Sequence, residues 1–247
     1  MGLLDAQRFL PQQATAGDPH GVKLRQTMRE AGDAECSLCR LLEDAERARL
    51  HWLAYEGLAD AGMRARLRQS RGFCPRHARL LYAVVADETR NLSAIAQVMR
   101  ELSAADAEVL ADARLGRGRR LRASVGRLTA ALQPAAVCPA CATAAEAAAR
   151  KASAFAAALA EPAFRELYAQ SAGALCRPHL LDVLVEVADA QAAGVLIDKH
   201  ITGLQRDIDD LDELLRKTDY RSAAEPKGAE QSSPLRSVLR FIGAWPR

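Results

Sequence analysis

Four short motifs contain every cysteine of the chain and two of its five histidines. Two are Cys-x-x-Cys pairs and two are Cys-x-x-His pairs, and 34 residues separate each cysteine pair from the Cys-x-x-His pair that follows it. Three thiolates and one neutral imidazole form a standard tetrahedral shell for structural zinc. We therefore predict two Cys3His zinc sites with eight metal ligands: Cys36, Cys39, Cys74, His77, Cys138, Cys141, Cys176 and His179.

The ligand types also suit other chemistry. An iron–sulfur cluster held by three cysteines and one histidine is the main alternative to zinc, because sulfur-rich shells suit both. A metal-free thiol switch is the second alternative, since residues 138–141 read CPAC. Thioredoxin-like chemistry expects that motif beside a β-strand, however, and no strand is predicted here. A shell of four protein ligands leaves no position for a reactive water, which favours a structural metal over a catalytic one.

The ligand motifs belong to an internal repeat. A shift of 102 residues places Cys36 on Cys138 and His77 on His179. Each copy reads as a cysteine pair, a helix, a break, a short helix, a Cys-x-x-His pair and a long helix with apolar residues three and four apart. The breaks are predicted at residues 60–62 and 161–162. Prolines just after ligand cysteines place the ligand pairs at helix N-termini, where the helix dipole favours thiolate.

The spacing allows two ways of closing the sites. Cys36 and Cys39 can join Cys74 and His77 within one repeat, or they can join Cys176 and His179 of the other repeat, because both spacers are identical in length. We favour closure within a repeat, since a unit that was duplicated must first have closed its own site.

The chain is therefore predicted to be all-α, with two pseudo-repeated helical units whose long helices pack as a bundle and whose Cys3His sites each staple one unit. Few aromatic residues (4%) and many small apolar ones agree with closely packed helices. The predicted division is an N-terminal arm with a short helix (1–35), repeat unit 1 (36–113), an Arg/Gly-rich joint and short helix (114–137), repeat unit 2 (138–219), and a linker and C-terminal helix (220–247).

Two apolar stripes bear on partners. The C-terminal segment carries Leu235, Val238, Leu239 and Ile242 on one helical face, and we expect it to dock on the bundle through Phe241, Ile242 and Trp245. The heptad-like stripe from Ile197 to Leu215 is typical of a helix that seals an intramolecular core, and it also suits a coiled-coil partner or a homodimer.

Composition argues against several other functions. A net charge of +3 gives no reason to expect nucleic acid, and the arginine-rich residues 114–127 lack interleaved aromatics. No signal-peptide pattern or apolar run of membrane-spanning length is present, so we expect a cytoplasmic protein without a membrane span, in which reduced cysteines bind metal. The sequence contains no catalytic motif.

The predicted role is a zinc-binding, non-catalytic scaffold or adaptor that binds a protein partner or forms a homo-oligomer. An iron–sulfur redox protein and a thiol-based redox regulator are the alternatives.

The doubled Cys-x-x-Cys and Cys-x-x-His pattern resembles a family of uncharacterised bacterial and archaeal proteins. The resemblance extends to Lys217-Thr218-Asp219-Tyr220-Arg221, which is similar to that family's segment after its last long helix, and to a short terminal helix ending near Gly243. Ser37 stands where proline is commoner in the family's first cysteine pair. The resemblance implies metal sites and architecture, and it implies no activity.

Overall fold

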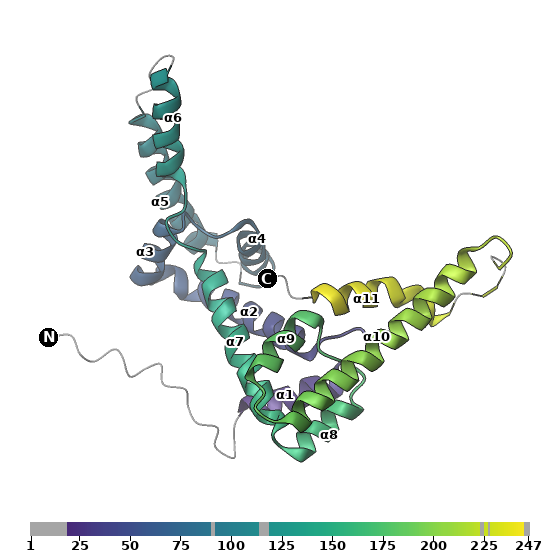
Figure 1. Ribbon diagram of the computed structural model, residues 1–247. Coiled ribbons are helices and arrows are strands. Elements are labelled where there is room, and N and C mark those ends of the chain that lie inside the picture. The colour runs from purple at the N-terminus through teal and green to yellow at the C-terminus, as the bar shows by residue number, and fades with distance from the viewer. Residues whose placement is uncertain (1–18, 90–91, 114–118, 223–224, 227, 245–247) are drawn as a thin grey trace. The chain divides into compact units, whose positions relative to one another are not determined.

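The protein is all-α, as predicted. The computed structural model describes residues 19–89, 92–113, 119–222, 225–226 and 228–244, and every regular element within these ranges is a helix (Figure 1). Among these residues, no helix has the length and apolar character needed to cross a membrane. Trp245, residues 1–18 of the predicted N-terminal arm and the start of the predicted joint at 114–118 lie outside the described residues.

The chain divides into two compact units. Unit 1 consists of residues 1–41 and 152–247, and unit 2 of residues 42–151. Both boundaries fall inside helices, namely α2 (Ser37–Tyr55) and α7 (Pro139–Leu159). These units are defined by spatial contacts, whereas the two repeats are defined by sequence, and the repeats remain a prediction about how the chain is organised.

Unit 1 has an aromatic core. Phe155 on α7 makes edge-to-face contacts with Phe164 and Tyr168 on α8, each at 5.5 Å between ring centroids. Edge-to-face pairing places the positive rim of one ring on the negative face of another and adds stability to simple burial. The elements of unit 1 besides the ends of α2 and α7 are α1 (Pro19–Glu30), α8 (Pro162–Gln170), α9 (Arg177–Glu186), α10 (Ala190–Thr218), the short 3₁₀ helix η4 (Ala229–Ser232) and α11 (Ser233–Ile242).

Unit 2 has an aliphatic core instead. Leucines of α2 pack there with the apolar faces of α3, α4 and α5, and the cluster includes Leu53, Met63, Leu81, Val85 and Val98. The elements of unit 2 besides parts of α2 and α7 are the short 3₁₀ helix η2 (Gly57–Ala59), α3 (Ala61–Gln69), α4 (Pro75–Ala83), the π-helix η3 (Val84–Thr89), α5 (Leu92–Ala111) and α6 (Arg119–Leu132). α6 packs against α5.

The predicted helix breaks are confirmed. Asp60 caps α3 by accepting a hydrogen bond from the Met63 N–H at 2.7 Å, and Pro162 begins α8. The prediction of one long helix after His179 is wrong in one respect, because the structure has two helices there, α9 and α10. Asp189 caps α10 by accepting hydrogen bonds from the backbone N–H groups of Gln191 and Ala192. Val187 takes extended backbone angles and ends α9, and Asp189, also extended, starts the next helix.

The C-terminal helix α11 docks with the opposite face from the one predicted. Its apolar residues Leu235 and Ile242 are 65% and 62% exposed, whereas Arg236 and Arg240 are buried. Arg236 donates to Asp207 Oδ1 at 2.7 Å, and Arg240 donates to Asp207 Oδ2 at 2.5 Å. The expected docking through the apolar face was wrong, because charge-assisted hydrogen bonds to this buried carboxylate hold the arginine face of α11 against α10. Phe241 is largely exposed, and its ring lies under the Arg177 guanidinium of α9 at 5.2 Å.

A glycine of α10 leaves room for the Arg240 guanidinium. Gly203 of α10 lies directly beneath the Arg240 guanidinium, and a Cβ built there would lie 2.5 Å from an Arg240 nitrogen. A side chain at this position would therefore force the Arg240 guanidinium to shift from its place beside Asp207.

Candidate metal centres

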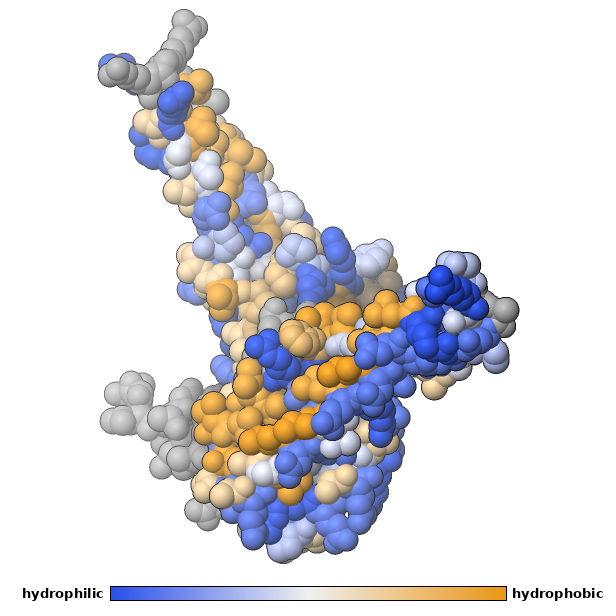
Figure 2. Space-filling view, turned by 45° about the vertical axis from the view of Figure 1, so that its right-hand side comes forward, coloured by the Kyte–Doolittle hydropathy of each residue, from blue (hydrophilic) through white to orange (hydrophobic). Residues whose placement is uncertain are grey.

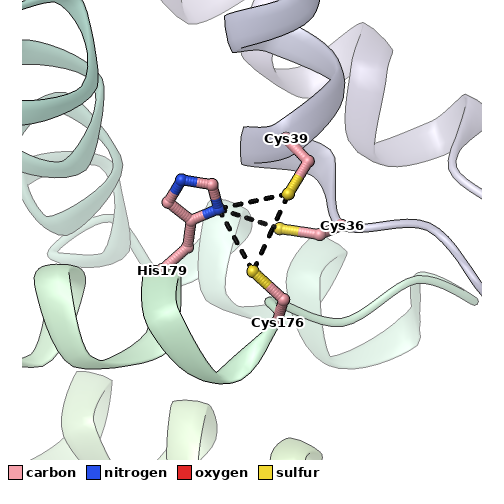
Figure 3. A group of neighbouring side chains, drawn as sticks. All are labelled: Cys36, Cys39, Cys176 and His179. Atoms are coloured by element: carbon pink, nitrogen blue, oxygen red, sulfur yellow. Dashed lines mark hydrogen bonds between the residues drawn. The ribbon is translucent and has the colours of Figure 1, made fainter. Parts of the chain in front are cut away.

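Site A gathers Cys36, Cys39, Cys176 and His179, and all four side chains are buried (Figure 3). Cys36 and Cys39 lie at the start of α2, and Cys176 and His179 lie at the start of α9. The Nδ1 atom of His179 points at the three sulfurs, at 3.5 Å from Cys36, 3.4 Å from Cys39 and 3.2 Å from Cys176. All the ligands belong to unit 1.

Site B gathers Cys74, His77, Cys138 and Cys141 in unit 2. Cys74 is the N-cap residue of α4, and Cys138 immediately precedes α7. His77 Nδ1 lies 3.2 Å from both Cys74 Sγ and Cys141 Sγ and 3.8 Å from Cys138 Sγ. The prediction that the ligand pairs lie at helix N-termini is confirmed at both sites.

The pairing favoured from the sequence is wrong. Each site takes its cysteine pair from one repeat and its Cys-x-x-His pair from the other, so neither repeat closes a site of its own. The physical reason is that α2 begins in unit 1 and ends in unit 2. Cys36 and Cys39 lie at its unit 1 end, whereas Cys74 and His77 follow in unit 2. The two sites therefore tie together distant parts of the sequence, 36–39 with 176–179 and 74–77 with 138–141.

The spacing of the ligand atoms fits a single tetrahedral ion. With bonds of about 2.3 Å to sulfur and 2.0–2.1 Å to nitrogen, a tetrahedron has edges of roughly 3.8 Å between sulfurs and roughly 3.5 Å between sulfur and nitrogen. The sulfurs of Cys39 and Cys176 are 3.7 Å apart, and those of Cys74 and Cys141 are 3.6 Å apart. None of the six cysteines forms a disulfide. Each cluster thus has the size and donor set of a Cys3His metal shell.

Two loops position the ligands of site A. The loop before Cys176 passes so close to the loop before Cys36 that a Cβ on Gly173 would lie 2.7 Å from the backbone oxygen of Glu35. The loop is fixed at Leu175, whose N–H donates to the Tyr168 hydroxyl at 3.3 Å and whose carbonyl lies 3.2 Å from His200 Nδ1. Buried side chains therefore hold the approach to Cys176 in place.

A left-handed turn positions the ligands of site B. After α3 the chain turns through Arg71 and Gly72, with φ values of 49° and 97°. The N–H of Gly72 donates to the Leu67 carbonyl at 2.8 Å, which satisfies the end of the helix. Nearby, the N–H of Ala135 donates to the Gln69 carbonyl at 2.8 Å and brings the segment before Cys138 beside this turn.

Glu46 is a site residue that the sequence analysis missed. Its Oε1 atom lies 2.6 Å from His77 Nε2, on the side of the ring away from the sulfurs, and its carboxylate also pairs with Arg76. A carboxylate in this position fixes the tautomer of a metal-binding histidine and makes its other nitrogen a better ligand. The repeat offset places Ala148 at the position that matches Glu46, so the second repeat has no carboxylate there. The sequence therefore shows no repeated pattern that would mark Glu46 as a site residue.

The ligands influence one another's proton affinity. Without a metal ion, hydrogen bonding to Cys138 raises the pKa of His77 to about 9 against the effect of burial. Burial lowers the pKa of His179, but hydrogen bonds with Cys176 and Cys39 outweigh it and raise that pKa to about 9. A metal ion must therefore displace a proton from each imidazole at neutral pH, and its binding becomes more favourable as the pH rises.

The chain was compared with known proteins. A family model described as a family of unknown function (DUF6062) matches residues 22–247. No curated protein and no solved structure matches the chain.

Proposed function

Since the chain belongs to DUF6062, a family of unknown function, we propose its role from the geometry of the two candidate metal sites. The protein is a non-catalytic helical scaffold held together by two structural zinc ions. The cysteine and histidine ligands are Cys36, Cys39, Cys176 and His179 for one ion and Cys74, His77, Cys138 and Cys141 for the other. Zinc supplies no chemistry in such a closed shell, and its contribution is to fix the starts of four helices.

The observation that carries this proposal is the spacing of the ligand atoms. Sulfurs 3.6–3.7 Å apart match the edges of one tetrahedron around one ion. In an iron–sulfur cluster the four protein ligands are divided among two or more irons, so some of the ligand atoms lie farther apart than one such edge. The geometry therefore supports zinc over the iron–sulfur alternative. A reducing cytoplasm, which we propose as the place of action, would keep all six thiols available.

The experiment that tests this function is the metal content of protein purified without oxygen, together with its visible absorption. Two zinc ions per chain and no visible absorption are expected. Iron and sulfide with a broad visible band would overturn the proposal in favour of an electron-transfer protein. The variant Cys39→Ser should bind close to one zinc ion instead of two and melt at a lower temperature, because site A loses a ligand.

A scaffold also needs a surface for its partner, and we propose that this surface is the apolar face of α10 and α11. Figure 2 shows hydrophobic residues gathered along both helices. On α10, the exposed Ile201, Ile208 and Leu215 lie seven residues apart, and on α11 Leu235 and Ile242 are exposed. Because the arginines of α11 occupy its contact with α10, its apolar residues Leu235, Val238 and Ile242 remain exposed.

We propose a second copy of this chain as the occupant. Ile201, Ile208 and Leu215 alternate with Ile197, Leu204 and Leu211 at spacings of three and four, which is the heptad pattern of helices that pair by knobs-into-holes packing. The isoleucines mostly occupy one heptad position and the leucines the other, as is typical of two-stranded coiled coils. The partner is therefore a long helix with a matching stripe, and α10 of another copy supplies one.

A further inference from the structure

The two candidate metal sites differ in how exposed their cysteine residues are. In site A, Cys36, Cys39 and Cys176 are all buried, with at most 7% of each residue exposed. In site B, Cys138 is buried, but Cys74 and Cys141 are both partly exposed. Oxidation of cysteine depends on access as well as on thiolate character, so an oxidant in solution reaches site B first.

The two accessible sulfurs are also neighbours. Cys74 Sγ and Cys141 Sγ lie 3.6 Å apart, and they come from the starts of different helices, α4 and α7. A disulfide bond is about 2.05 Å long, so an approach of roughly 1.5 Å would join them. The start of α4 directs its positive dipole end at Cys74, its N-cap residue, which favours the reactive thiolate.

We propose that Cys74 and Cys141 are the oxidation site of this protein: a hydroperoxide joins them in a disulfide and site B releases its zinc ion, while site A keeps its own. This inference rests on the proposed function, because it requires zinc in both sites before oxidation.

The reaction balances with a hydroperoxide as the oxidant. One thiolate attacks a peroxide oxygen, the O–O bond breaks, and the sulfur becomes a sulfenic acid while the departing oxide takes up a proton. The second thiolate attacks that sulfur and displaces hydroxide, which takes up another proton as water. The two sulfurs lose two electrons and the peroxide gains them. Zinc leaves because only Cys138 and His77 remain as ligands.

The disulfide preserves part of the structure that zinc held. It still ties the start of α4 to the start of α7, the same two segments that the metal ligands connect. What changes is local, because Cys138 and His77 lose their common ion. Oxidation of site B should therefore alter the region around Cys138 without separating these helices.

The test uses the full-length, zinc-loaded wild-type protein, in which site A serves as the internal control. Zinc content is measured first, and failure to find two ions contradicts the proposed function before any oxidant is added. Hydrogen peroxide is then added in steps, and released zinc is followed with a chromophoric chelator. Free thiols are blocked, and the protein is digested without reduction for mass spectrometry.

The expected result is release in two phases, the first of one ion per chain. At the end of that phase, tryptic peptide 72–76, which contains Cys74, should be linked to peptide 128–150. Because peptide 128–150 contains both Cys138 and Cys141, fragment ions must place the link on Cys141. Simultaneous release of both ions, earlier oxidation at Cys36, Cys39 or Cys176, or a first disulfide between any other pair overturns the inference.

Discussion

Cys36 Sγ lies 3.5 Å from Nδ1 of His179, although 143 positions separate the two residues in the sequence. This contact joins the cysteine pair of one repeat to the histidine of the other. The sites are therefore crossed between the repeats, and neither half of the chain can close a site by itself.

The crossed pairing can be tested with double variants. Cys36→Ser combined with Cys176→Ser damages one site, so the protein should keep one zinc ion. Cys36→Ser combined with Cys74→Ser damages both sites, and zinc content should fall close to zero. Metal content by mass spectrometry separates the two cases, and pairing within repeats would give the reverse order. Each pair of substitutions removes two thiols, so the two variants control for one another.

Glu46→Gln should weaken zinc binding at site B. The amide keeps the shape of the side chain but removes the charge beside His77 Nε2 and Arg76. Loss of such a supporting carboxylate typically lowers metal affinity by about 10–100-fold. Competition with a chelator of known affinity measures the change, and site A supplies the reference. The exposed Glu43 on the same helix gives the matched control Glu43→Gln, which should leave both ions bound as tightly as before.

Asp207→Asn should release α11 from α10. Asp207 is buried and binds both Arg236 and Arg240. The substitution leaves Arg240 with a neutral partner, whereas Arg236 keeps its ion pair with Asp210. Removing one member of a buried ion pair costs about 3 kcal/mol or more. Hydrogen exchange in residues 233–242 should increase. The control Asp209→Asn, on an exposed residue of α10, should leave that exchange unchanged.

The same contact should weaken in acid. Burial raises the pKa of Asp207, but hydrogen bonds from Arg240 and Arg236 outweigh it, so its pKa in the folded protein lies below the ordinary value. The ionised Asp207 carboxylate contributes fully to stability above its pKa in the unfolded chain, about 3.9. This contribution disappears as the pH falls through the lower pKa of Asp207 in the folded protein. Exchange in α11 should therefore increase below about pH 4 in the wild type, and Asp207→Asn should show much less of this dependence.

Ile208→Asp should disrupt the proposed dimer. Ile208 is 56% exposed at the middle of the α10 stripe, so a carboxylate there is tolerated in the isolated chain but costly in a packed interface. Light scattering during size-exclusion chromatography should give a dimer mass for the wild type and a monomer mass for the variant. Thr202→Asp, outside the stripe on the same helix, should remain dimeric. A wild-type chain that stays monomeric would exclude a second copy and leave another helical protein as the occupant.

The sequence alone determined the local properties of this protein. The candidate ligands followed from residue types and spacing, because a Cys-x-x-Cys or Cys-x-x-His pair brings its two side chains to one point regardless of the rest of the fold. The all-helical class and the starts of α3, α4, α7 and α8 followed from periodicity, from Asp60 and from prolines such as Pro75 and Pro162. These signals act within a few residues, so no tertiary contact was needed to recognise them.

Only the tertiary structure decided which distant groups meet. Equal spacers allowed Cys36 to pair with either histidine, and the path of α2 between the two units selected His179. The apolar stripe of α11 predicted the wrong docking face, because the buried carboxylate that attracts Arg236 and Arg240 lies 29 and 33 residues away, on another helix. The role of Glu46 depended on a contact with His77 across 31 positions. Such contacts arise from packing between helices, and local sequence patterns carry no information about their partners.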